Sequence, residues 1–293
     1  MTKQQVLAKL DQYEKLMRLD KPIGILLLLW PTLWGVWIAS WGRPNWVIVW
    51  IFTLGTVLMR SAGCVINDYA DQDFDKHVER TRDRPITAGR VSGREALALA
   101  GALALVALIL ILPLDPLVLK MSVPAVLLAI SYPYTKRFLP LPQAYLGLAF
   151  SFGIPMAFAA TQFNVPELAW MLMAANLFWV LGYDTLYAMV DKPDDLKIGI
   201  KTSAITFGRF DAEIAMLCHG IFIAGMAYIG HELHRGLFWY LSLAGAAAHV
   251  GYQYHLVRQR DRQRCFKAFL SNNWLGAMVF AGVVLDYWKK LTP

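Results

Sequence analysis

The chain has 293 residues, of which 57% are hydrophobic and only 17% are charged. A soluble domain carries about 25% charged residues, so this composition excludes an ordinary soluble protein and predicts an all-α protein that crosses a membrane several times. The three cysteines are too few and too scattered for a disulfide framework or a zinc site. The net charge of +7 suits an anionic lipid surface, and no nucleic-acid partner is expected.

Residues 1–21 are predicted to form an amphipathic helix on the membrane surface, because apolar residues recur there at helical spacing between charges. The acidic residues of this segment are atypical of a mitochondrial transit peptide. We expect residues 22–293 to form a single transmembrane domain.

Apolar stretches of the chain predict nine membrane-spanning helices, since a helix needs roughly 20 residues to cross the hydrocarbon. They are residues 22–41, 46–66, 96–112, 117–132, 143–161, 168–190, 213–230, 236–254 and 272–288. The third and fourth are short, and the fourth contains Lys120, so eight spans are the alternative.

Lys and Arg are distributed unevenly among the segments between these spans. Twenty-two of them lie in residues 1–21, 67–95, 133–142, 191–212 and 255–271, whereas four lie in the alternate segments. Positively charged loops stay in the cytoplasm. We therefore expect a multi-pass protein of the bacterial inner membrane, with its N-terminus and long loops in the cytoplasm.

The first acidic motif (residues 67–75) begins where the second span ends. Asn67, Asp71 and Asp75 are spaced i, i+4 and i+8, so they share one helix face if the span continues beyond residue 66, and Asp68 borders that face. An unpaired ionised group at the end of a span is expensive. These acids are therefore expected to bind a ligand rather than only solvent.

The second acidic motif (residues 187–195) places Tyr187, Asp191 and Asp195 at the same spacing. Pro193 predicts a helix break near Lys192, with Asp195 on a new turn. Ten residues separate Asp75 from ITAGR (86–90), and nine separate Asp195 from ITFGR (205–209). This echo predicts a duplication, in which motifs at 67–90 and 187–209 belong to two halves facing one cavity.

Neither acidic motif contains His or Cys, and oxygen ligands alone select a hard cation. Mg²⁺ is the usual one, held by a few carboxylates together with substrate phosphates. Basic residues follow both motifs, and guanidinium groups bind phosphate oxygens in pairs. Those expected to bind a diphosphate are Arg80, Arg84, Lys136, Lys197 and Lys201. A diphosphate head group with an apolar body in the bilayer describes a polyprenyl diphosphate.

The two motifs resemble those of the UbiA superfamily of intramembrane prenyltransferases. NDYADQDFD (67–75) matches the pattern NDxxDxxxD, and YAMVDKPDD (187–195) matches YxxxDxxxD. The flanking segments RTRDRPITAGRVS (80–92), SYPYTKR (131–137) and KIGIKTSAITFG (197–208) resemble the branch that prenylates 4-hydroxybenzoate. The resemblance covers almost the whole chain, although Pro193 departs from the expected pattern.

The resemblance implies a helical bundle around a central cavity, capped on the cytoplasmic side by the motif loops and open sideways to lipid. It implies Mg²⁺-dependent transfer of a polyprenyl group from its diphosphate to the ring carbon ortho to the hydroxyl of 4-hydroxybenzoate, a step of ubiquinone biosynthesis. The implied metal ligands are Asn67, Asp68, Asp71, Asp75, Asp191 and Asp195. The implied catalytic residues are Asp71, Asp75, Asp191, Asp195 and Tyr187.

Arg60 lies inside the second span, seven residues before Asn67 and on nearly the same face. We expect Arg60 or Arg137 to hold the benzoate carboxylate or a phosphate oxygen. The base that removes the ring proton is open between Asp191 and the product diphosphate. The alternatives are the same chemistry on a naphthoate, homogentisate or haem, and a cation or metabolite transporter with acidic gates. Charges gathered at one surface, rather than at the midplane, favour the enzyme.

Overall fold

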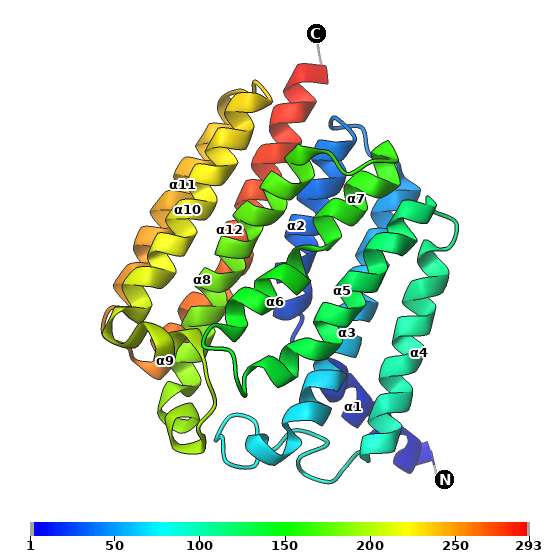
Figure 1. Ribbon diagram of the computed structural model, residues 1–293, viewed down its shortest axis with the longest axis vertical. Helices are drawn as coiled ribbons and strands as arrows, with labels where there is room; N and C mark the ends of the chain where they lie inside the picture. Colours follow the sequence, from blue (N-terminus) through cyan, green and yellow to red (C-terminus); the bar gives the residue numbers. More distant parts are fainter. Residues whose placement is uncertain (1–2, 292–293) are drawn as a thin grey trace.

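The computed structural model describes residues 3–291, and within that range it is a bundle of α-helices without a β-strand (Figure 1). The helices are α1 (Lys3–Met17), α2 (Ile23–Ala39), α3 (Trp46–Asp75), α4 (Gly93–Ile111), α5 (Pro116–Thr135), α6 (Pro142–Ser151), α7 (Gly153–Gln162), α8 (Glu167–Ile198), α9 (Ser203–Phe207), α10 (Asp211–Glu232), α11 (Leu237–Val257) and α12 (Arg262–Leu291). A 3₁₀ turn, Gly208–Phe210, precedes α10. The predicted all-α fold is confirmed.

Local sequence signals fix where several of these helices begin. Asn45 accepts a hydrogen bond from the backbone N–H of Val47 at the start of α3, and Asp115 accepts one from Leu117 at the start of α5. Ser92 and Glu95 form a reciprocal capping box on α4. Each cap satisfies a backbone N–H that has no partner inside the helix, which is why the helices start at these polar residues.

Six helical segments are long and apolar enough to cross a membrane: Trp46–Asp75, Gly93–Ile111, Pro116–Thr135, Pro142–Gln162, Ser203–Glu232 and Arg262–Lys290. The apolar helix Ile23–Ala39 is shorter. The predicted number of nine spans stays a prediction. The fifth expected span, residues 143–161, is not one regular helix, because it breaks at Phe152 between α6 and α7. Pro155 lacks the N–H that would continue the hydrogen-bond ladder across this break.

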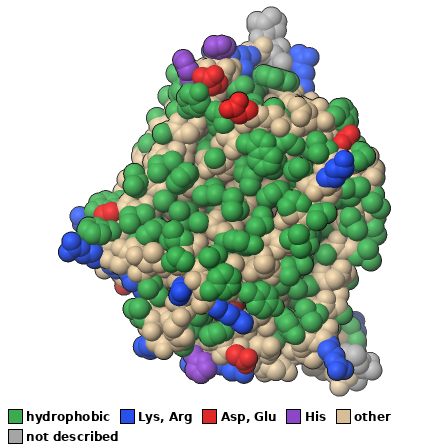
Figure 2. All heavy atoms as spheres, in the orientation of Figure 1, with side chains coloured by type: hydrophobic (Ala, Val, Ile, Leu, Met, Phe, Trp, Pro, Cys, Tyr) green, Lys and Arg blue, Asp and Glu red, His purple; other side chains and the backbone are tan. Residues whose placement is uncertain are grey.

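Apolar side chains cover the middle of the face shown in Figure 2, and charged side chains lie mainly toward its margins. Exposed leucine and isoleucine side chains line several apolar helices: Leu105, Ile109, Leu127, Leu217 and Leu241 are each more than half exposed. A surface of this kind is stable against lipid and unfavourable against water. The chain is therefore a multi-pass membrane protein.

Three large aromatic side chains meet in the core between α2, α8 and α10. The rings of Trp34 and Trp179 lie 5.3 Å apart, and both approach Phe222, at 5.5 and 5.6 Å. All three side chains are fully buried. Aromatic contacts of this type add to the free energy gained by burial, so they fix α8, which carries the second acidic motif, against its neighbours.

Both acidic motifs lie at the same end of the bundle as α1, the lower end in Figure 1. α3 continues to Asp75, so Asn67, Asp71 and Asp75 share one helix face as predicted. The helix break predicted near Lys192 is wrong, because α8 runs through Pro193 to Ile198. The Lys192 ammonium is held by the Gly208 carbonyl and by Asp211. These contacts outweigh the weak preference against helix before proline, so Asp191 and Asp195 share a continuous face.

Candidate active site

A large cavity of about 1460 Å³ opens between the helices α2 to α8 and reaches the loop that joins α3 to α4. Its deeper wall is apolar and includes Leu27, Phe52, Met59, Leu108, Phe150 and Met156. Its rim, at the motif end of the bundle, holds Asp71, Asp75, Asp191, Asp195 and several basic side chains. A cavity with one charged end and a long apolar body fits an amphiphilic ligand.

The first acidic motif is paired with cations from other parts of the chain. Lys136 Nζ, just beyond α5, lies 2.6 Å from Asp71 Oδ2 and 3.0 Å from Asn67 Oδ1. Arg84 Nη1 lies 2.7 Å from Asp75 Oδ2. Asp71 and Asp75 are each 6% exposed, so these ion pairs form in surroundings of low dielectric constant. Burial alone would lower the pKa of Lys136, but the nearby Asp71 outweighs it and raises that pKa.

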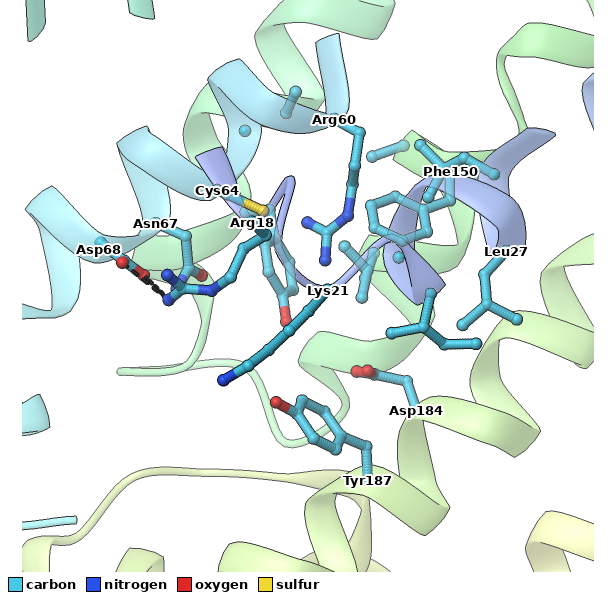
Figure 3. A pocket seen from close by; sticks show the side chains of 18 of the residues that line it. Arg18, Lys21, Leu27, Arg60, Cys64, Asn67, Asp68, Phe150, Asp184 and Tyr187 are labelled. Atoms are coloured by element: carbon cyan, nitrogen blue, oxygen red, sulfur yellow. Dashed lines mark hydrogen bonds and ion pairs between the residues drawn. The ribbon is translucent and has the colours of Figure 1, made fainter. Parts of the chain in front are cut away.

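Asp68 turns toward two arginines. Arg18, which follows α1, donates to both Asp68 carboxylate oxygens at 2.9 and 2.8 Å (Figure 3), and Arg84 Nη1 lies 2.9 Å from Asp68 Oδ1. Asp68 therefore fixes the N-terminal segment and Arg84 beside the first acidic motif. This arrangement distinguishes Asp68 from the other acids predicted to bind metal.

The second acidic motif is joined to the loop after α3 by Arg80. Its Nε donates to both oxygens of Asp191 at 3.1 Å, and its Nη2 lies 2.5 Å from Asp191 Oδ2. The same guanidinium lies 4.5 Å from the centre of the Tyr187 ring, which stacks on Phe269 at 4.4 Å. One loop thus connects the two motifs, which the sequence predicted to face a shared cavity.

Asp195 lies on α8 beyond its apolar part and is 7% exposed. Burial, and after it the neighbouring Asp191 carboxylate, raise the pKa of Asp195 to about 7. Among residues 3–291 it forms no ion pair. A cation that binds beside such a carboxyl stabilises its ionised form.

The donor set of the two motifs fits Mg²⁺. Within the described residues, no three His, Cys, Asp or Glu side chains are close enough together to hold a metal by themselves. Mg²⁺ does not need such a cage, since it usually takes one or two carboxylates, water and substrate phosphates. Asp71, Asp75, Asp191 and Asp195 line the cavity with oxygen donors only, as that mode of binding requires.

Arg60 extends from α3 into the apolar part of the cavity, two turns deeper than Asn67 (Figure 3). Its guanidinium carbon lies 5.6 Å from the centre of the Phe150 ring, and its Nε has no hydrogen-bond partner. A Cβ on Gly24 would lie 2.6 Å from Arg60 Nε, so a larger residue there would require the guanidinium to move. The structure places a free guanidinium where an anionic ligand can reach it.

Three predicted site residues lie outside the cavity wall. Arg137 is exposed and donates to the Ala70 carbonyl at 3.0 Å. Lys197 is exposed and lies 3.4 Å from Asp194 Oδ1, and Lys201 donates to the Phe138 carbonyl at 3.0 Å. Of the predicted diphosphate-binding residues, Arg80, Arg84 and Lys136 are therefore those that the structure brings together.

Two residues that line the cavity were not predicted from the sequence as site residues. Arg18 is one of many basic residues near the N-terminus, and nothing in the sequence indicates its contact with Asp68. Asp184 lies in the sixth predicted span and lines the cavity. Its signal was available, since an ionisable residue inside an apolar span is by default a functional candidate.

The loops around the second acidic motif are anchored by one buried carboxylate, Asp211. It is 0% exposed and lies 2.5 Å from Lys192 Nζ and 2.7 Å from Arg260 Nε. Lys192 follows Asp191 directly, and Arg260 belongs to the segment between α11 and α12. Asp211, the first residue of α10, therefore holds α8 against α10 and the segment between α11 and α12.

Asp211→Asn is expected to lower the free energy of unfolding by about 3 kcal/mol, because it removes the buried negative charge that Lys192 and Arg260 share. Unfolding of the purified protein in detergent, followed by tryptophan fluorescence, measures this. Glu213→Gln is the matched control, since Glu213 contacts the same Arg260 at 3.1 Å but is exposed, and it is expected to change little. Equal stabilities of the two variants would contradict the anchoring role.

The fold and the site define a class: an α-helical membrane protein whose cavity accepts an apolar ligand with a charged head group. The sequence model of the UbiA prenyltransferase family matches residues 28–280. The chain belongs to this family.

The matching relatives extend over nearly the whole chain. A 4-hydroxybenzoate octaprenyltransferase of Nitrosospira multiformis is 65% identical over 279 residues, which are 95% of this chain and 96% of that protein. Another 4-hydroxybenzoate octaprenyltransferase, of Dechloromonas aromatica, is 62% identical over 280 residues, covering 95% of each chain.

Solved structures share the fold. A UbiA homolog from Aeropyrum pernix K1 superposes with a TM-score of 0.78 at 24% identity, covering 89% of this chain and 97% of that one. A UbiA homolog from Archaeoglobus fulgidus bound to GPP and Mg²⁺ superposes with a TM-score of 0.70 at 16% identity, covering 93% and 99%. At these identities the likeness supports the helical architecture alone.

Proposed function

We propose that this protein transfers a polyprenyl group from a polyprenyl diphosphate to 4-hydroxybenzoate, at the ring carbon ortho to the hydroxyl, in ubiquinone biosynthesis. The reaction is Mg²⁺-dependent. The observation that carries the proposal is the pairing of two acidic motifs with Arg80, Arg84 and Lys136 at the charged end of one apolar cavity. Relatives named 4-hydroxybenzoate octaprenyltransferases support this acceptor and favour an octaprenyl donor.

The charged end of the cavity binds the diphosphate. When Mg²⁺ is bound, it supplies positive charge to the phosphate oxygens, and the residues that would hold it are Asn67, Asp71, Asp75, Asp191 and Asp195. Arg80, Arg84 and Lys136 are already oriented toward the same space by their acidic partners. Fixed cations of this kind stabilise the charge that develops on the leaving diphosphate more than they stabilise the substrate.

The apolar part of the cavity receives the prenyl chain and protects the allylic cation. Phe52, Leu108 and Phe150 offer no nucleophile, and the Tyr187 ring lies near the reacting end. Aromatic faces stabilise a nearby cation, and exclusion of water prevents its hydrolysis. The loop that carries Arg80 closes the charged end, so we assign it the role of a lid.

The acceptor enters beside Arg60, whose unpartnered guanidinium receives the benzoate carboxylate. A planar guanidinium and a carboxylate form two parallel hydrogen bonds, which fix the ring orientation. Arg60 lies seven residues before Asn67, so the ring binds about two helical turns deeper in the cavity than the diphosphate. We further propose the inner membrane as the location, with the motif loops in the cytoplasm, because Lys and Arg are concentrated in those loops.

Membranes containing the full chain are expected to form 3-polyprenyl-4-hydroxybenzoate when supplied with octaprenyl diphosphate, 4-hydroxybenzoate and Mg²⁺. Removal of Mg²⁺ with EDTA is expected to abolish the product, because carboxylates alone repel the diphosphate. Chromatography of the lipid extract measures the product. A dihydroxynaphthoate, homogentisate and haem serve as competing acceptors. Product from one of these and none from 4-hydroxybenzoate would overturn the acceptor assignment.

A further inference from the structure

Asp184 is a buried carboxylate that faces the cavity without a partner. It is 9% exposed, and it forms no hydrogen bond or ion pair with any residue in 3–291. Its carboxylate points from α8 into the space below Arg60, on the same side as the Tyr187 hydroxyl (Figure 3). Burying an unpaired carboxylate is costly. The fold therefore retains at this position a group that is expected to find its partner in a ligand.

The position of Asp184 mirrors that of Arg60 in the other half of the cavity. Asp184 precedes Asp191 by seven residues on α8, as Arg60 precedes Asn67 by seven on α3. Seven residues of helix span about 10 Å, so each charge lies two turns below its acidic motif. Arg60 and Asp184 face the same cavity, yet they form no ion pair with one another. A polar ligand can occupy the space between them.

The residues next to Asp184 carry no second carboxylate. The Thr185 hydroxyl donates to the Leu181 carbonyl and bonds to Ser203, away from the cavity. The Tyr183 ring packs on Trp179 at 5.3 Å, whereas its hydroxyl, which lines the same cavity, has no hydrogen-bond partner. Asp191 is bound by Arg80 at the rim. Asp184 is therefore the carboxylate of α8 that remains available at the depth of Arg60.

We propose that Asp184 accepts the phenolic proton of the acceptor whose carboxylate is held by Arg60, an inference that rests on the proposed function. The two substituents of 4-hydroxybenzoate point in opposite directions from the ring. One cation and one hydrogen-bond acceptor facing the same space recognise these two ends. The carbon ortho to the hydroxyl then lies on the side of the ring nearer to the diphosphate.

The proton transfer completes the chemistry of substitution. The ortho carbon bonds to the allylic carbon while the C–O bond of the prenyl diphosphate breaks, with its electron pair leaving on the diphosphate. The phenolic proton moves to Asp184, so the alkylated ring becomes a neutral dienone instead of a cation. The departing diphosphate takes the ring proton, aromaticity returns, and Asp184 gives its proton back to the oxygen. General base catalysis of this kind contributes about 10²–10⁴-fold.

Asp184→Asn in the full chain is expected to lower kcat for 4-hydroxybenzoate about 10²-fold, with KM for octaprenyl diphosphate within about twofold of wild type. The more acidic acceptor 3-fluoro-4-hydroxybenzoate gives the deciding comparison. Its phenol is more acidic and depends less on a base to lose the proton. The ratio of wild-type to variant kcat is therefore expected to be at least about fivefold smaller with this acceptor than with 4-hydroxybenzoate. A purely structural defect would raise the ratio of wild-type to variant kcat equally with both acceptors.

Two further variants keep the test decisive. Asp184→Glu retains a proton acceptor and is expected to keep at least about a tenth of the wild-type kcat, whereas Asp184→Asn is expected to keep about a hundredth. Asp286→Asn changes another buried carboxylate, which accepts hydrogen bonds from Gly236 far from the cavity, and is expected to keep wild-type kinetics. Asp184→Asn is also expected to unfold at or above the wild-type temperature, because it removes an unpaired buried charge.

The outcomes separate this inference from the proposed function. An active wild type together with an unimpaired Asp184→Asn variant would overturn the inference alone, as would an equal loss with both acceptors. A wild type that transfers no prenyl group to 4-hydroxybenzoate would overturn the proposed function, and the role of Asp184 with it.

Discussion

Replacing Asp191 by asparagine is expected to lower kcat about 10²–10³-fold, the usual loss when one group that stabilises transition-state charge is removed. The side chain keeps its size, so the packing of α8 is preserved, but the second acidic motif loses the carboxylate that orients Arg80. We expect the Mg²⁺ concentration for half-maximal rate to rise as well. Initial rates at several Mg²⁺ concentrations measure both effects.

Asp73→Asn is the matched control for this prediction. Asp73 belongs to the first acidic motif, but its side chain is 82% exposed and pairs with Lys76 on the surface. Its replacement is expected to leave kcat within about twofold of wild type, since exposed ion pairs contribute little. Wild-type activity in Asp191→Asn would remove the second motif from the metal site.

The sequence predicted the helical architecture because its strongest signals are local. Long apolar stretches and polar caps such as Asn45 and Ser92 act within a few residues. The path of α8 was mispredicted because Pro193 is an equally local signal, whereas the contacts that keep Lys192 helical come from Asp211, 19 residues further along the chain. A rule that considers neighbours only has no access to that contact.

The acidic residues of the site were predictable from spacing, whereas their partners were not. Asp71 and Asp75 lie on one face because a helix repeats every 3.6 residues. That Lys136 contacts Asp71 while Lys201 turns to a backbone carbonyl depends on how the loops fold in space. Arg18 reaches Asp68 across 50 residues of sequence. The sequence shows that Arg18, Lys136 and Lys201 are basic, but it does not show which of them contacts an acidic residue of the site.

Replacing Arg60 by leucine is expected to raise KM for 4-hydroxybenzoate about 10²-fold while lowering kcat less. The guanidinium is held inside the apolar part of the cavity, where losing one partner of a charge pair costs about 2–5 kcal/mol. An interaction made equally in the bound substrate and in the transition state appears in KM. KM for octaprenyl diphosphate is expected to stay unchanged, because Arg60 lies two turns below the charged rim.

Arg137→Leu decides between the two arginines that the sequence offers for the acceptor carboxylate. Arg137 is exposed, donates to the Ala70 carbonyl and lies over the Phe74 and Tyr134 rings, at 5.5 and 5.2 Å from their centres. Its loss is expected to affect KM for 4-hydroxybenzoate less than the loss of Arg60. The reverse order would move the acceptor from the cavity to the surface of the motif loops. A ring bound there would lie outside the apolar cavity in which the allylic cation is protected from water.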